Sequence, residues 1–138
     1  MRVSALNGSA AAEEAARKRS EPCRKRILLV DDQPSVREAI SLLLSLDEHT
    51  VVEASNGAEA LDLFKGDHFD LVITDFEMPK MKGNELAVRI KQLSPAQPIL
   101  MITAYAATLG DSVNPVDAIL NKPFQLADLR RAMAEHLS

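Results

Sequence analysis

Short runs of β-branched and aliphatic residues alternate along the chain with longer stretches in which apolar residues recur every three or four positions. The runs lie at residues 26–31, 50–54, 69–75, 98–103 and 116–120. Several of them are continuously apolar, which is typical of strands that are buried on both faces of a parallel sheet. The pattern predicts an α/β fold, with five parallel strands and helices packed on the sheet.

The stretches between the runs predict amphipathic helices with recognisable ends. Pro34 suits the first turn of a helix that continues to about Leu46. Asn56 and Glu59 form a capping-box pattern for a helix that ends at Gly66. The remaining helices are expected between Gly83 and Pro95, as a shortened fourth helix between Thr103 and Asn114, and from Leu126 to Leu137.

Length and charge divide the chain into a tail and one domain. A length of 138 residues suits a single domain, which we place at residues 26–138. Residues 1–26 carry seven Lys and Arg against three Glu, and residues 27–138 carry nine against seventeen Asp and Glu. We therefore expect a flexible basic tail at residues 1–25, followed by an acidic body that repels nucleic acid.

The chain offers no sign of a membrane or oxidising environment. No apolar run approaches the roughly 18 residues that a membrane span needs, and the N-terminal residues lack the apolar stretch of a secretory signal. Cys23 is the single cysteine and has no partner for an internal disulfide. These features predict a cytoplasmic protein without membrane contact.

Polar residues of a few types follow four of the predicted strands. Asp31 and Asp32 end the first, Asp75 the third and Thr103 the fourth, while the fifth runs into Asn121 and Lys122. Ligands of parallel α/β sheets bind outside the carboxyl ends of the strands, near the point where the strand order reverses. We therefore expect these side chains to form one site.

The composition of that edge indicates a divalent cation and phosphoryl chemistry. Two carboxylates about 5 Å apart repel each other by roughly 3 kcal/mol at an effective dielectric constant of 20, so three together call for a counter-ion. Oxygen ligands favour Mg²⁺, and the three histidines have no ligand spacing. A carboxylate such as Asp75 can act as a nucleophile toward phosphorus, and Lys122 and Thr103 can bind phosphoryl oxygens.

Four motifs together resemble the receiver domain of two-component response regulators. They are the Asp31-Asp32 pair, Asp-x-x-Met-Pro at residues 75–79, Thr103-Ala104, and Lys122-Pro123-Phe124. The resemblance covers residues 26–138. It implies a doubly wound, flavodoxin-like sheet with strand order 2-1-3-4-5.

The resemblance also implies a function and a role for each site residue. Asp75 would accept phosphate from a sensor histidine kinase or a histidine phosphotransfer protein, and Thr103 and Lys122 would approach the new phosphoryl group. The Mg²⁺ ligands would be Asp31, Asp32, Asp75 and the backbone carbonyl of Glu77. Such a domain is a signalling switch that assists its own phosphorylation and dephosphorylation, and it would act on an unknown downstream protein.

The sequence departs from the family pattern in two places. The position three residues before Lys122, where many receivers have an aromatic residue, holds Ile119, which argues against the usual ring rotation. The interval from Thr103 to Lys122 is a few residues short for the family, hence the shortened fourth helix.

The resemblance implies two further features. The Lys122-Pro123 bond is expected to be cis, and Glu77 and Tyr105 are expected to flank the path of the attacking water.

Two other functions fit parts of this evidence. A phosphatase-like hydrolase also uses an aspartyl nucleophile, but such enzymes place it after the first strand with a second acid two residues later, where this chain has Gln33. A degenerate receiver would bind proteins without being phosphorylated, but here the acidic residues, Thr103 and Lys122 are all present.

Overall fold

The structure is a computed structural model that describes residues 24–104 and 116–136. The predicted flexible tail lies almost wholly outside the described residues, as do the predicted fourth helix and Tyr105. Those expectations therefore stay predictions.

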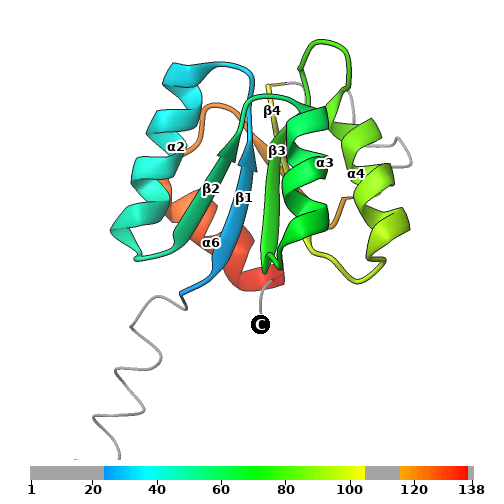
Figure 1. Ribbon diagram of the computed structural model, residues 1–138. Helices are drawn as coiled ribbons and strands as arrows, with labels where there is room; N and C mark the ends of the chain where they lie inside the picture. The colour runs from blue at the N-terminus through cyan, green and yellow to red at the C-terminus, as the bar shows by residue number, and fades with distance from the viewer. Residues whose placement is uncertain (1–23, 105–115, 137–138) are drawn as a thin grey trace, which may run out of the picture.

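Five parallel strands form one sheet in the order β2-β1-β3-β4-β5 (Figure 1). Their bounds are β1 Arg26–Val30, β2 Thr50–Ala54, β3 Leu71–Asp75, β4 Ile99–Thr103 and β5 Ala118–Asn121. The predicted fold class and strand order are confirmed. The order reverses beside β1 and β3, which is where this fold class binds its ligands.

Helices cover both faces of the sheet. Among the described residues they are α2 Pro34–Leu46, α3 Gly57–Gly66, α4 Gly83–Leu93 and α6 Leu126–His136. Figure 1 shows α2 and α6 on one side of the sheet and α3 and α4 on the other. The domain is therefore a three-layer α/β/α arrangement.

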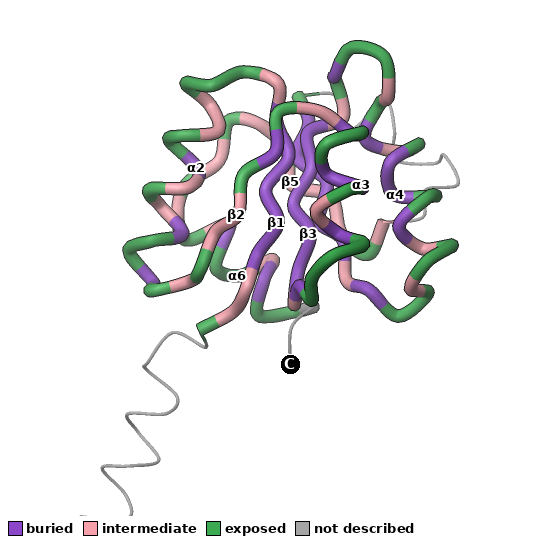
Figure 2. Tube along the Cα trace, viewed as in Figure 1, coloured by how far each residue is buried: buried purple, intermediate pink, exposed green. Residues whose placement is uncertain are grey.

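Successive residues of the central strands face opposite layers. On β1, Leu28 and Val30 pack in the core under α3 and α4, whereas Ile27 and Leu29 pack under α2 and α6. Figure 2 shows β1 and β3 buried along almost their whole length, as the continuously apolar runs predict. Met133 of α6 belongs to the second core.

Local signals set the helix starts correctly. Asn56 caps α3 by accepting a hydrogen bond from the backbone N–H of Glu59 at 2.8 Å. The Glu59 carboxylate in turn accepts one from the backbone N–H of Ser55 at 2.6 Å, so the predicted capping box is present, shifted by one residue at its return bond. Pro34 is the first residue of α2, as predicted.

The predicted strand ends are wrong by one or two residues at several places. β3 begins at Leu71 rather than residue 69, and β5 spans Ala118–Asn121 rather than 116–120. At β5 the shift follows from Asp117, whose carboxylate accepts a hydrogen bond from the backbone N–H of Ile99 at 2.8 Å. A side chain therefore takes the place of a strand partner there, and regular pairing starts one residue later.

Among the described residues no helix is both long and apolar enough to cross a lipid bilayer.

A buried carboxylate joins the two helices on one face of the sheet. Asp47, directly after α2, accepts hydrogen bonds from Arg130 of α6 at 2.7 Å (Nε) and 2.6 Å (Nη2). These bonds hold the pKa of Asp47 below its usual range. The carboxylate therefore stabilises the fold above its unfolded pKa of about 4, and this contribution is lost as the pH falls through the lower folded pKa.

Replacing Asp47 by asparagine should lower the midpoint of urea unfolding at neutral pH, because the charged pair with Arg130 is lost. The difference from the native protein should shrink at an acid pH below the lowered folded pKa of Asp47, where the native carboxyl group is itself protonated. Urea titrations at both pH values measure the effect. A difference that stays constant with pH would assign the loss to packing instead of charge.

Candidate functional site

The candidate site lies at the carboxyl ends of four strands. Asp31 and Asp32 follow β1, Asp75 ends β3, Thr103 ends β4 and Lys122 follows β5. The strand register places Asp75 beside Ile102 and Thr103 beside Asn121, so the five side chains start from one edge of the sheet.

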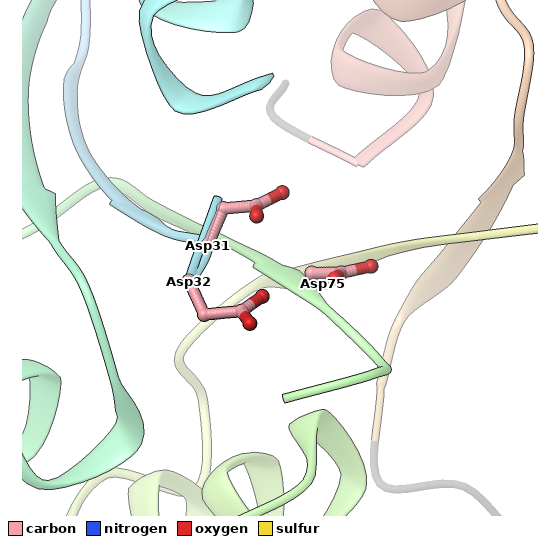
Figure 3. Close-up of side chains that lie close together, drawn as sticks. All are labelled: Asp31, Asp32 and Asp75. Atoms are coloured by element: carbon pink, nitrogen blue, oxygen red, sulfur yellow. The ribbon is translucent and has the colours of Figure 1, made fainter. Parts of the chain in front are cut away.

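The three aspartates form a compact acidic cluster. One carboxylate oxygen from each of Asp31, Asp32 and Asp75 lies within 4.8 Å of the others. Figure 3 shows the side chains of Asp31 and Asp32 projecting from adjacent positions toward the side of the cluster where Asp75 lies. Asp31 and Asp75 are buried and Asp32 is half-buried. The grouping predicted from the strand ends is thus present in the structure.

Burial is the main influence on the charge of the two inner aspartates. It raises the pKa of Asp31, against the backbone N–H of Gln33, which donates to Oδ1 at 2.9 Å. Burial also raises the pKa of Asp75, against the positive charge of Lys122. The cluster therefore holds its negative charge at a cost, which a bound cation would remove.

Lys122 supplies a positive charge inside the site. Its Nζ atom lies 3.2 Å from Oδ1 of Asp75, and its backbone N–H donates to the carbonyl of Thr103 at 2.8 Å. The predicted cis bond between Lys122 and Pro123 is confirmed. The 3.2 Å contact places the ammonium group beside the carboxylate that we expect to carry the phosphoryl group.

The donor set fits a hard divalent cation. Oδ1 of Asp32 is buried, and among the described residues it has no hydrogen-bond partner. A buried carboxylate oxygen without a partner is costly, and a bound cation would satisfy it. Oxygen atoms from three carboxylates at this spacing suit Mg²⁺, and no histidine or cysteine belongs to the cluster.

The other predicted site residues take different positions. Thr103 is buried at the end of β4. The Glu77 carboxylate lies outside the acidic cluster and pairs with Nζ of Lys82 at 3.3 Å, which leaves its backbone carbonyl as the predicted ligand. Ile119, at the position of the family's aromatic residue, is half-buried on β5.

Two supporting residues were missed from the sequence. Arg37 of α2 donates a hydrogen bond to the backbone carbonyl of Asp31 at 2.7 Å. Gly83 begins α4, as predicted, but it lies so close to β3 that an added Cβ atom would lie 2.3 Å from the carbonyl oxygen of Asp75. Gly83 follows Met78 by five residues, which indicates a turn, but no sequence signal indicates its contact with Asp75.

Replacing Gly83 by alanine should destabilise the fold by about 1–3 kcal/mol, because the new methyl group meets the backbone of Asp75. This cost exceeds the gain of up to about 1 kcal/mol that alanine brings to a helix. Gly66→Ala is the matched control, since an added Cβ atom there meets nothing within 4 Å. Urea unfolding compares the two, and equal stabilities would show that the contact is relaxed without cost.

Comparison with known proteins identifies relatives over most of the chain. The family model of the response regulator receiver domain matches residues 27–134. The response regulator receiver protein CpdR of Brucella abortus is 40% identical over 108 residues, which cover 76% of this chain and 90% of CpdR. The response regulator protein PilR of Pseudomonas aeruginosa is 35% identical over 118 residues, which cover 83% of this chain and 26% of PilR.

Solved structures show the same fold. The response regulator TrrA of Thermotoga maritima, in complex with Mg²⁺-BeF, has a TM-score of 0.77 and 35% identity over 82% of this chain and 99% of TrrA. TrrA in complex with the histidine kinase ThkA has a TM-score of 0.76 and 36% identity over 83% of this chain and 99% of TrrA. With the family model matching most of its length, the chain belongs to the response regulator receiver domain family of two-component signalling systems.

Proposed function

We propose that residues 26–138 are the phosphoacceptor of a two-component phosphorelay, with Asp75 as the residue that is phosphorylated. The observation that carries this proposal is the place of Asp75 in the acidic cluster, with the ammonium group of Lys122 3.2 Å from its Oδ1 atom. The donor would be the phosphohistidine of a sensor histidine kinase or a histidine phosphotransfer protein. The complex of TrrA with ThkA supports this class of partner.

The proposed Mg²⁺ ligands are Asp31, Asp32, Asp75 and the backbone carbonyl of Glu77. Bound Mg²⁺ supplies charge neutralisation between the carboxylates and the incoming phosphoryl oxygens. The Mg²⁺-BeF complex of TrrA supports this cofactor. In this chain the acidic cluster supports it independently, as does Oδ1 of Asp32, which has no hydrogen-bond partner within residues 24–104 and 116–136.

The chain's own groups then have distinct tasks in the transfer. A carboxylate oxygen of Asp75 forms the bond to phosphorus as the N–P bond of the phosphohistidine breaks, and the imidazole leaves with its electron pair. Lys122 holds one phosphoryl oxygen by charge, and the hydroxyl group of Thr103 donates a hydrogen bond to another. Hydrolysis of the acyl phosphate would reset the domain. The family resemblance implies that Glu77 and Tyr105, the latter outside the described residues, flank the path of the water.

The output is a change in a protein-interaction surface. The approach of Thr103 and Lys122 to the phosphoryl group would bias the domain between two conformations, and a downstream protein would bind one of them. We place this switch in the cytoplasm, with an acidic body that avoids direct contact with nucleic acid.

Acetyl phosphate labelling followed by mass spectrometry tests the proposal. The protein should gain one phosphoryl group on Asp75 in Mg²⁺ and none when EDTA is added. Continuous turnover of a phosphomonoester would favour the hydrolase instead. Absence of both labelling and a beryllofluoride complex in Mg²⁺ would favour a module that acts without phosphorylation.

A further inference from the structure

Arg37 joins three parts of the fold next to the acidic cluster. It lies on the first turns of α2, and its side chain is only 17% exposed. Its Nη1 atom donates to the backbone carbonyl of Asp31 at 2.7 Å, and its Nε atom donates to Oε1 of Glu53 on β2 at 3.0 Å. The guanidinium group therefore connects β2, the turn after β1 and α2.

Three hydrogen bonds, one of them from Arg37, fix the position of Asp31. Its backbone N–H donates to the carbonyl of Ala54 at 3.1 Å, and its Oδ1 atom accepts from the backbone N–H of Gln33 at 2.9 Å. The bond from Arg37 adds the backbone carbonyl to this set. One oxygen of the Asp31 carboxylate is thus engaged by the turn, and the position of the whole residue is set from three directions.

The carbonyl of Asp31 also determines how Asp32 is presented. That carbonyl and the N–H of Asp32 belong to one planar peptide group, so fixing the direction of the oxygen fixes the plane from which Asp32 leaves the chain. Oδ1 of Asp32 is the buried carboxylate oxygen of the cluster that lacks a partner in the described part of the chain. Its placement relative to Asp31 and Asp75 determines whether three oxygens meet at one ion.

We propose that Arg37 is a positioning residue for the divalent cation, which it serves by holding the Asp31–Asp32 peptide while Glu53 holds Arg37. This inference rests on the proposed function and adds to it a residue that touches neither the cation nor the phosphoryl group. Partners that orient metal ligands through hydrogen bonds typically change metal affinity by about 10-fold or more when they are removed.

The charge of Arg37 by itself predicts the opposite change in Mg²⁺ affinity when the residue is replaced. A guanidinium group near a cation site repels the cation, and Glu53 at 3.0 Å cancels much of that repulsion. Removing only the charge of Arg37 would therefore tighten Mg²⁺ binding or leave it unchanged. The geometric role predicts weaker binding, so the direction of the change distinguishes the two explanations.

The experiment measures the Mg²⁺ dissociation constant by isothermal titration calorimetry on the native chain, Arg37→Met and Arg37→Lys. Arg37→Met should raise the dissociation constant by about 10-fold. Arg37→Lys keeps the charge, but one ammonium group cannot reproduce the two bonds in the same geometry, so we expect a smaller rise of about threefold. Arg89→Met is the matched control, because the side chain of Arg89 is 53% exposed and pairs with Glu85 on α4.

Urea unfolding in EDTA, run on the same proteins, separates affinity from stability. Weaker Mg²⁺ binding in both Arg37 variants, with no change in Arg89→Met, supports the inference. Unchanged or tighter binding in the variants overturns it even if they unfold more readily, and so does a loss confined to Arg37→Met if Arg37→Lys binds as the native chain does. If the native chain itself binds no Mg²⁺, the proposed function fails together with this inference.

Discussion

Asp75→Asn should abolish phosphorylation by acetyl phosphate, with a loss of about 10³-fold or more in labelling rate, because an amide is a far weaker nucleophile than a carboxylate. The substitution keeps the size and shape of a side chain that is buried at the end of β3. It also removes one negative charge from a crowded cluster, so the variant should fold at least as stably in EDTA. Mass spectrometry of the intact protein over time measures the rate.

Asp62→Asn is the control for Asp75→Asn, since Asp62 is an exposed residue of α3 away from the acidic cluster. It should be labelled at the native rate. Labelling of Asp75→Asn at a rate close to native would place the acceptor elsewhere. Peptide mapping would then show which residue carries the phosphoryl group.

The fold was predictable because strands that are buried on both faces have a clear apolar sequence pattern. β1, β3 and β4 are covered on both faces, so their sequences are apolar at nearly every position. Boundaries were less predictable, because they depend on which group completes each backbone hydrogen bond. The backbone N–H of Ile99 donates to the side chain of Asp117, which is distant in sequence, and no local pattern indicates this bond.

The acidic cluster was predictable for a topological reason. Parallel strands end at one edge, and Asp31 and Asp75 lie near each other because β1 and β3 are neighbours in the sheet. The strand order itself came from the family resemblance and not from periodicity. Arg37 was not predictable, because its role consists of a bond to a backbone carbonyl, and an arginine on a helix usually only faces solvent.

The role of Gly83 was likewise not predictable from the sequence, because it depends on a backbone contact. Its closeness to the carbonyl of Asp75 depends on how α4 packs against the end of β3, which follows from the whole fold. A glycine before a predicted helix is compatible with many loops. A reactive residue can be recognised in the sequence by its residue type. A residue that supports it can be recognised only by its position in the folded structure.

Lys122→Met should slow phosphorylation of Asp75 by about 10²–10³-fold, because a positioned charge that stabilises a transition state typically contributes this much. The ammonium group lies 3.2 Å from Oδ1 of Asp75 and is the nearest cation to it in the described structure. Methionine keeps the length and apolar part of the side chain. Mg²⁺ should bind at least as tightly to the variant, since a positive charge has been removed beside the cluster.

The pH dependence of labelling gives Lys122→Met a second signature. In the native chain burial raises the pKa of Asp75, and the charge of Lys122 opposes that rise. Without Lys122 the pKa should rise further, so the pH at which the carboxyl group becomes a nucleophilic carboxylate moves upward. As the pH is lowered, labelling should therefore begin to decrease at a higher pH in the variant than in the native chain.

Lys65→Met, which removes an exposed lysine from the last turn of α3, is the matched control and should leave both the rate and its pH profile unchanged. A Lys122→Met variant that binds Mg²⁺ normally yet is labelled slowly separates the two electrostatic tasks of the site. The acidic cluster holds the cation, and the lysine receives the phosphoryl charge. Labelling of Lys122→Met within about threefold of the native rate would contradict this division, because the expected transition-state contribution is at least 10²-fold.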